Sequence, residues 1–327
     1  MTDEHTEAGW AFAEADRAKP EQVDYDLDRV LQSMVALHAE IPEDAFTAGI
    51  LGTERVGNGI VIGDSGLVLT IGYLTTEAET IWLRNHAGTA VSGYPIGYDF
   101  ETGFGLVQAL GPLNAPVLEF GNKNLSAGAK VVVAGHGGYE HALAATVVGK
   151  RAFAGYWEYA LDEAIFTMPA HPNWGGAALI GPGGRLYGVG SLFVQNALGG
   201  EQRSDGNMIV PIDLLPPILD DLLKYGAANR RPRPWMGVYA ADVSDQPVIV
   251  GLVEEGPAHK AGLHPGDIVL QLKGSPIGDL LDFYRTVWDI GPAGALIPLT
   301  VAREGRVSEI TIRSIDRSSM LKSPKLH

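Results

Sequence analysis

Residues Gly256–Val269 read GPAHKAGLHPGDIV, and this stretch decides how the C-terminal part of the chain is interpreted. It lies within a block in which short apolar runs predict strands. The predicted strands are Met236–Tyr239, Val248–Val253, Ile268–Leu272, Ile297–Val301 and Glu309–Ile312. Between them, Leu280, Phe283, Tyr284 and Val287 recur at the spacing of one helix face. The block therefore predicts a compact domain over residues 235–316, with a helix from Asp279 to about Asp289.

A larger block precedes this domain, and a Pro- and Arg-rich linker over residues 227–234 separates the two. Residues 48–226 alternate short β-rich runs with glycines, which favours one β-barrel or a pair of barrels. A helix over Leu214–Tyr225, with Gly226 as its C-cap, is predicted to close this domain. The predicted strands are Gly59–Ile62, Leu67–Thr70, Thr80–Leu83, Gly105–Ala109, Lys130–Ala134, Leu143–Val148, Ala177–Ile180 and Tyr187–Leu192.

The two ends of the chain differ from these blocks. Residues 1–47 predict a helical segment, with Asp26 as N-cap. The apolar positions on which this prediction rests are Leu27, Val30, Leu31, Met34 and Val35. Residues 317–327 form a polar tail. The sequence as a whole predicts a mainly β protein of two domains with an N-terminal helix.

Composition narrows the function classes. The formal charge of −15 makes nucleic acid and anionic membranes poor partners. The chain has no cysteine, so disulfides and thiolate catalysis are excluded. The first 22 residues lack the charged and apolar regions of a signal peptide, and no run is apolar enough to span a membrane. These observations predict a cytoplasmic protein.

Several stretches resemble the HtrA/DegP family of trypsin-fold serine proteases that carry a PDZ domain. Gly256–Val269 resembles the family's G-x-P-A-x-x-A-G-L-x-x-G-D-x-I run, with one residue fewer between Gly256 and Pro257. His171–Ala177 is similar to the P-G-N-S-G-G-P stretch around the nucleophile. Further matches are Gly57–Ile62, Ser65–Thr70, Asp99–Val107, Gly184–Val189, Asn207–Pro211 and Trp235–Val238. The resemblance implies a double β-barrel followed by one PDZ domain.

The resemblance also implies where the catalytic residues belong. The histidine, aspartate and serine positions hold Tyr73, Gly103 and Trp174. A phenol is a poor base at neutral pH, a glycine has no carboxylate, and an indole cannot attack a carbonyl. Pro172 stands where a glycine supplies an oxyanion N–H, and proline has none. We therefore expect no enzyme activity, but a catalytically inactive homologue that acts as a peptide-binding scaffold.

The alternative is an active serine endopeptidase with displaced catalytic residues. Ser191 is the candidate hydroxyl, and three histidines, His136, His141 and His171, are the candidate bases. The same histidines could bind a metal, but no recognisable ligand spacing supports this, and neither metal nor cofactor is predicted. The aromatic run Phe153–Tyr159 is interpreted as lining the cleft or as packing between the barrels.

The predicted PDZ domain has a candidate peptide-binding site. In the loop Trp235-Met236-Gly237-Val238, successive backbone N–H groups are expected to point at the carboxylate of a protein C-terminus. Phe283 and Tyr284, on the predicted helix, form the opposite wall. A domain that serves only as a packing module remains open. The resemblance also implies a possible homotrimer, for which Trp10 and Phe12 are candidate contacts.

Overall fold

The computed structural model describes residues 11–122, 124–200 and 202–322. Within these ranges the chain forms two compact units. The first contains the residues up to Arg151, residues 163–228 and Lys322. The second contains residues 152–162 and 229–321. Each unit is described by itself below.

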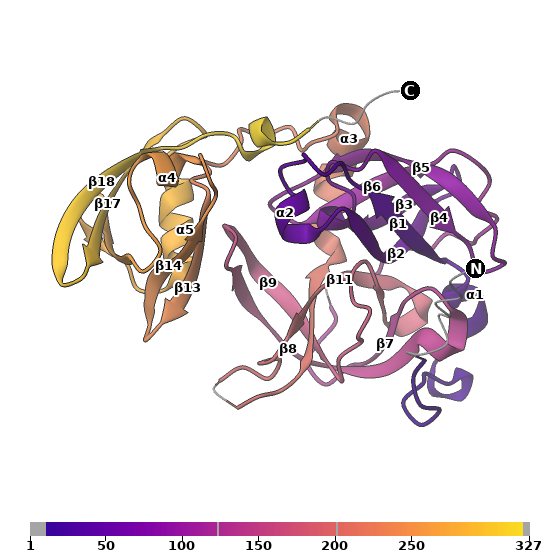
Figure 1. Ribbon diagram of the computed structural model, residues 1–327. Coiled ribbons are helices and arrows are strands. Elements are labelled where there is room, and N and C mark those ends of the chain that lie inside the picture. The colour runs from indigo at the N-terminus through magenta and orange to yellow at the C-terminus, as the bar shows by residue number, and fades with distance from the viewer. Residues whose placement is uncertain (1–10, 123, 201, 323–327) are drawn as a thin grey trace, which may run out of the picture. The chain divides into compact units, whose positions relative to one another are not determined.

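The first unit begins with a closed barrel of antiparallel strands in the order β1-β2-β3-β6-β5-β4 (Figure 1). In its register Met34 lies opposite Ile60, and Leu69 opposite Leu106. All four side chains are buried, so they form part of the barrel core. The strands are β1 (Met34–Glu40), β2 (Glu54–Gly63), β3 (Leu67–Ile71), β4 (Thr80–Arg84), β5 (Ala90–Tyr98) and β6 (Phe104–Ala109).

A second closed barrel follows, in the order β10-β11-β12-β9-β8-β7. Its core is aliphatic, and residues such as Val133, Leu179 and Ile209 are fully buried in it. Burial of such a side chain stabilises the fold by about 1.5–3 kcal/mol. The strands are β7 (Lys130–Ala134), β8 (Ala142–Gly155), β9 (Tyr159–Met168), β10 (Ala178–Ile180), β11 (Leu186–Val194) and β12 (Gly206–Pro211).

The N-terminal helix is shorter than the sequence predicted. α1 covers only Leu27–Leu31, and the Asp26 side chain caps it by accepting a hydrogen bond from the Arg29 N–H at 3.1 Å. Met34 and Val35 instead begin β1, where both are fully buried. The helical prediction for Met34 and Val35 is therefore wrong, because buried residues of a strand continued the helical spacing of the apolar residues before them.

The helices of the first unit otherwise have clear sequence causes. α2 covers Ala48–Leu51 and α3 covers Pro216–Tyr225. Pro216 starts α3 at a position that needs no N–H donor. Gly226 ends α3 as predicted, with a φ of +73°.

The second unit contains a sheet in the order β13-β14-β15-β17-β18, with β16 paired to β15. α5 lies beside the strands of this sheet (Figure 1). Its buried residues, including Phe283 and Tyr284, belong to the core of the domain. The elements are β13 (Val238–Val243), β14 (Gln246–Leu252), α4 (Pro257–Lys260), β15 (Ile268–Leu272), β16 (Ser275–Pro276), α5 (Leu280–Asp289), β17 (Leu296–Arg303) and β18 (Arg306–Arg313). The predicted mainly β fold, with two barrels, a PDZ-like domain and an N-terminal helix, is confirmed.

Short 3₁₀ turns complete the described elements. They cover Pro20–Gln22, Gly72–Leu74, Gly138–His141, Pro182–Gly184, Ile212–Leu214 and Arg317–Met320. None of the helices in the described ranges has the length and hydrophobicity that crossing a bilayer requires.

Candidate functional site

Tyr73, Gly103 and Trp174 lie close together in the first unit. Tyr73 follows β3 on the turn Gly72–Leu74, and its hydroxyl donates a hydrogen bond of 2.9 Å to the Ser191 carbonyl. Burial raises the pKa of the Tyr73 phenol well above its ordinary value, against a hydrogen bond with the Trp174 side chain that lowers it. The phenol therefore keeps its proton at neutral pH and is not a base.

Gly103 supports the turn on which Tyr73 lies. Its carbonyl accepts a hydrogen bond of 2.8 Å from the Gly72 N–H, and its own N–H donates to the Asp99 carbonyl at 2.8 Å. Its φ of +88° falls in the region that favours glycine. Gly103 therefore shapes this position through its backbone alone.

Asn58 connects the segment around Trp174 to the first barrel. Its Nδ2 donates to the Asn173 carbonyl at 3.0 Å and to the Gly175 carbonyl at 3.2 Å, while its Oδ1 accepts from the His136 N–H at 2.8 Å. The Asn58 side chain is buried. The motif Gly57–Ile62 included this residue, but the sequence did not reveal this role.

The segment after Trp174 passes close to Asn58. Gly176 has a φ of +75°, and a Cβ there would lie 1.9 Å from the Asn58 carbonyl oxygen. The next residue, Ala177, donates its N–H to the Trp174 carbonyl at 3.0 Å. Glycine is therefore required at position 176 by both the backbone conformation and the close approach.

The candidate bases have different surroundings. His171 is fully buried, its Nδ1 accepts from the Asn173 N–H at 3.1 Å, and its Nε2 donates to the His141 carbonyl at 3.2 Å. Burial lowers the pKa of His171 to about 4. Backbone groups therefore engage both ring nitrogens of a neutral imidazole. His136 donates from Nε2 to the Asn85 carbonyl at 3.1 Å.

Two further predictions concern metal and oligomer contacts. No group of three or more potential ligands gathers at one point among the described residues. Trp10 lies outside the described residues. The Phe12 ring contacts the His171 ring of the same chain edge-on, with centroids 5.0 Å apart. The predicted homotrimer stays a prediction.

In the second unit, the loop before β13 surrounds a carboxylate. The N–H groups of Met236, Gly237 and Val238 donate to Glu158 Oε1 at 3.2, 2.7 and 3.0 Å, and the Met236 N–H also lies 3.0 Å from Oε2. Gly237 permits this arrangement with a φ of +77°. Burial raises the pKa of Glu158 to about 7, although the three N–H groups and Arg317 lower it. Three successive backbone donors thus converge on one acidic group.

The other residues of the predicted peptide site lie around this loop. The Tyr284 hydroxyl accepts from the Glu158 N–H at 3.2 Å. Phe283 is fully buried in the domain core, and the Trp235 N–H donates to the Ile315 carbonyl at 3.0 Å. The aromatic run Phe153–Tyr159 belongs to this second unit, which neither interpretation of it predicted. Glu158 is the acidic residue of that run, and no local signal identified it.

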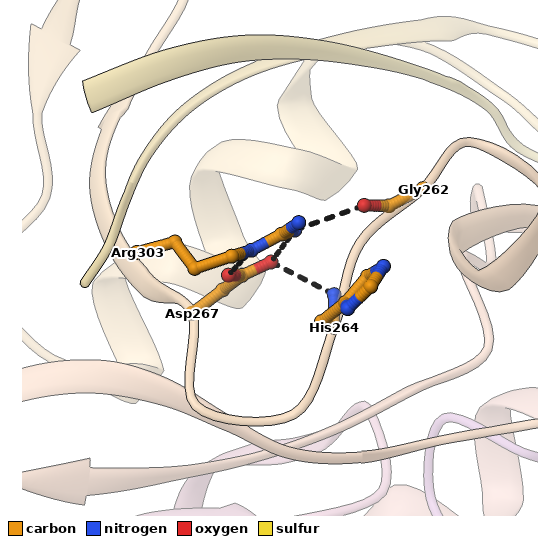
Figure 2. A network of polar contacts seen from close by, with 4 residues as sticks. All are labelled: Gly262, His264, Asp267 and Arg303. Carbon is orange, nitrogen blue, oxygen red and sulfur yellow. Dashed lines mark hydrogen bonds and ion pairs between the residues drawn. The ribbon is translucent and has the colours of Figure 1, made fainter. Parts of the chain in front are cut away.

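A polar network holds the turn between α4 and β15 (Figure 2). The Arg303 guanidinium donates to both carboxylate oxygens of Asp267, at 2.6 and 2.7 Å, and to the Gly262 carbonyl at 2.9 Å. The His264 N–H donates to Asp267 Oδ2 at 2.8 Å. The network gives Asp267 of the sequence motif a structural role, because it fixes the turn that leads into β15.

Comparisons with known proteins agree with this architecture. Residues 57–189 match the trypsin-like peptidase domain, and residues 234–313 match the PDZ domain. Probable periplasmic serine endoproteases that are DegP-like, from Pseudomonas putida (strain W619) and Pseudomonas fluorescens, are 25% and 27% identical over 79% and 80% of this chain. The chain spans 55% and 57% of those relatives.

Solved structures show the same fold. The HtrA-type protease AlgW with a tripeptide aligns with a TM-score of 0.52 and 19% identity, over 91% of this chain and 97% of that one. The same protease with a decapeptide gives a TM-score of 0.52 and 18% identity, over 91% and 98% of the two chains.

These names correct two predictions. We predicted a catalytically inactive scaffold that is not an enzyme, and this is contradicted because the relatives are named as serine endoproteases. We also predicted a cytoplasmic protein, and this is contradicted because the same relatives are named as periplasmic. Both predictions rested on local stretches, the triad positions and the first 22 residues. Residues 57–189 are therefore similar to a trypsin-like peptidase domain and residues 234–313 to a PDZ domain, and the chain shares its fold with the HtrA-type protease AlgW.

Proposed function

We propose that this chain is an HtrA-type serine endopeptidase of the periplasm, whose PDZ domain binds the C-termini of proteins. One observation carries the binding part of the proposal: the N–H groups of Met236, Gly237 and Val238 converge on a single carboxylate. Charge-assisted hydrogen bonds of this kind suit a terminal carboxylate, and the adjacent strand β13 offers its edge to the rest of a peptide.

The binding part is tested with short peptides on the full chain. Acetyl-Gly-Tyr-Trp-Xaa with a free C-terminal carboxylate, with Xaa as Val, Leu, Phe or Ala, is titrated and followed by NMR shifts of the loop amides. The matched control is each peptide with a C-terminal amide. Binding of at least one carboxylate peptide, and of none of the amides, supports the proposal. Equal binding of the two forms refutes a carboxylate site.

The endopeptidase part is supported by the names of the relatives. We further propose that Tyr73, Gly103 and Trp174 occupy the triad positions and that Pro172 removes one oxyanion donor. Hydrolysis on this chain then requires a nucleophile at another position. Ser191, a buried residue of β11, is the candidate: its backbone carbonyl accepts from the Tyr73 hydroxyl, which places this serine beside the proposed histidine position.

Casein hydrolysis and fluorophosphonate labelling of the purified chain test this part. Activity that disappears in Ser191→Ala and survives in Ser65→Ala, a serine outside this region, supports it. Purified wild-type chain that neither cleaves nor is labelled refutes the endopeptidase part and leaves the binding part standing.

A further inference from the structure

The carboxylate in the PDZ loop belongs to the chain itself. We infer that residues 152–162, called the internal ligand below, occupy the PDZ groove as a mimic of a protein C-terminus, with Glu158 in place of the terminal carboxylate. This inference rests on the proposed function of the loop. It assigns the groove a closed state, which a free C-terminus must displace.

The spacing of the contacts supports the mimicry. Glu158 accepts from the Val238 N–H, and two residues earlier the Tyr156 carbonyl accepts from the Ala240 N–H at 2.8 Å. A step of two residues along β13, from Val238 to Ala240, therefore corresponds to a step of two residues in the opposite direction along the internal ligand, from Glu158 to Tyr156. This is the register of an added antiparallel strand, in which the carboxylate enters the loop and the preceding residues pair with the strand.

Further contacts with α5 and β13 hold the internal ligand in the groove. On α5, the Tyr284 hydroxyl accepts from the Glu158 N–H, and Arg285 forms an ion pair of 2.6 Å with Asp162. On β13, the Tyr239 ring lies 5.9 Å from the Tyr156 ring. The internal ligand therefore contacts both walls of the groove.

The backbone of the internal ligand is adapted to this position. Glu158 has a φ of +57°, a left-handed conformation that is unfavourable for a residue with a Cβ. The side chain is almost fully buried, although glutamate is seldom buried without partners. Such strain and burial are typical of a residue whose position is set by a specific contact.

If Glu158 mimics a terminal carboxylate, the internal ligand and a free peptide should compete for the groove. An attached ligand acts at a high effective concentration, so the groove is open in only a fraction of molecules and the apparent affinity for a peptide falls by that fraction. If the open fraction is about one tenth or less, removal of the Glu158 carboxylate tightens peptide binding by about tenfold or more.

The experiment measures the affinity of the acetyl-Gly-Tyr-Trp-Xaa carboxylate peptides for the full chain. The variants are Glu158→Ala, which removes both acceptor oxygens, and Glu158→Gln, which keeps the shape but replaces one of these oxygens with an NH2 group that meets a backbone N–H donor to donor. The control is Glu163→Gln, an exposed glutamate of β9 that pairs with Lys150. We expect both Glu158 variants to bind about tenfold tighter or more, and Glu163→Gln to bind like wild type. Peptide affinity that is unchanged in both Glu158 variants overturns the inference.

Hydrogen exchange separates failure of the inference from failure of the proposed function. In Glu158→Ala, the amides of Met236, Gly237 and Val238 are expected to lose protection, and those of β17 to keep it. Unchanged protection of the loop overturns the internal contact. If the loop amides lose protection but no variant binds any carboxylate peptide, both the proposed peptide-binding function and the competition between Glu158 and peptide are refuted. If the variants bind carboxylate peptides with the affinity of the wild type, only the competition is refuted.

Discussion

Asn58→Leu is the sharpest test of how the two barrels are joined, because leucine replaces both polar atoms of asparagine with carbon and keeps the branched shape. The change removes three hydrogen bonds, those to Asn173, Gly175 and His136. The Gly175 carbonyl keeps a partner, since the Asn58 backbone N–H donates to it at 2.8 Å. Two groups, the Asn173 carbonyl and the His136 N–H, lose the Asn58 bond.

A buried polar group left without its partner costs about 1–3 kcal/mol. Because the His136 N–H is only partly buried, we expect a total loss of about 2–4 kcal/mol in the stability of the first unit. At about 1.4 kcal/mol for each factor of ten, the most protected amides should exchange about 30- to 1,000-fold faster.

Native-state hydrogen exchange by mass spectrometry measures this loss unit by unit. Peptides from β2 and β10 should show the faster exchange, while peptides from β15 and β17 serve as an internal control in the second unit. Asn122→Leu is the matched variant, since the exposed Asn122 side chain accepts from the nearby Asn124 N–H. Wild-type protection of β2 and β10 in Asn58→Leu would refute the argument that this side chain joins the barrels.

Three further predictions concern pH. The pKa of Glu158 is raised to about 7 from a reference of 4.5, so the closed groove is most favoured below pH 4.5 and weakens as pH rises from 4.5 to 7. The peptide affinity of the wild type should rise between pH 4.5 and 7, and that of Glu158→Gln should stay flat. The groups that face Glu158 are Arg317, Tyr239 and Tyr284. Burial lowers the pKa of His171 to about 4 from 6.5, against backbone hydrogen bonds that raise it. The free energy of unfolding of the first unit should therefore fall as pH drops from 6.5 to 4, by at most about 1.4 kcal/mol per pH unit. His171→Gln should lose this dependence in denaturant titrations. Despite its burial, the pKa of Asp267 is lowered by Arg303, so the second unit should lose stability as pH falls below the ordinary aspartate range, and thermal melts of Arg303→Met should lack that component.

The elements that the sequence predicted well carry their own end signals. α5 begins where the Asp279 side chain accepts from the Asp282 N–H, and its buried face is the predicted set of Leu280, Phe283, Tyr284 and Val287. α3 ends at Gly226 for the same kind of local reason. Local backbone chemistry specifies these boundaries, so the surrounding fold is not needed to find them.

Strands without such signals were missed or misassigned. Met34 and Val35 continued a helical spacing, yet both are fully buried in β1, which pairs with β2 along one edge and with β4 along the other. β5 was missed entirely; it is mostly half-buried and contains Gly93 and Pro95, which weaken any strand pattern. In both cases the pairing partners decide the structure, and they lie far away in the sequence.

In the PDZ loop, too, some features follow from local sequence and others depend on residues far away in the chain. The resemblance to a PDZ domain implied that the backbone of Met236, Gly237 and Val238 presents successive N–H groups, and Gly237 allows this with a positive φ. Met236 and Val238 are buried, so their donors need an acceptor whenever the groove is closed to water. The acceptor expected from the sequence was the carboxylate of a protein C-terminus, whereas in the structure it is the side chain of Glu158, a residue 78 to 80 positions away. A peptide that displaces Glu158 replaces one carboxylate in the loop with another, so the hydrogen bonds to the loop are similar before and after. Two other effects then decide the competition. Release of the strained Glu158 backbone favours the peptide, whereas the high effective concentration of the attached internal ligand favours Glu158.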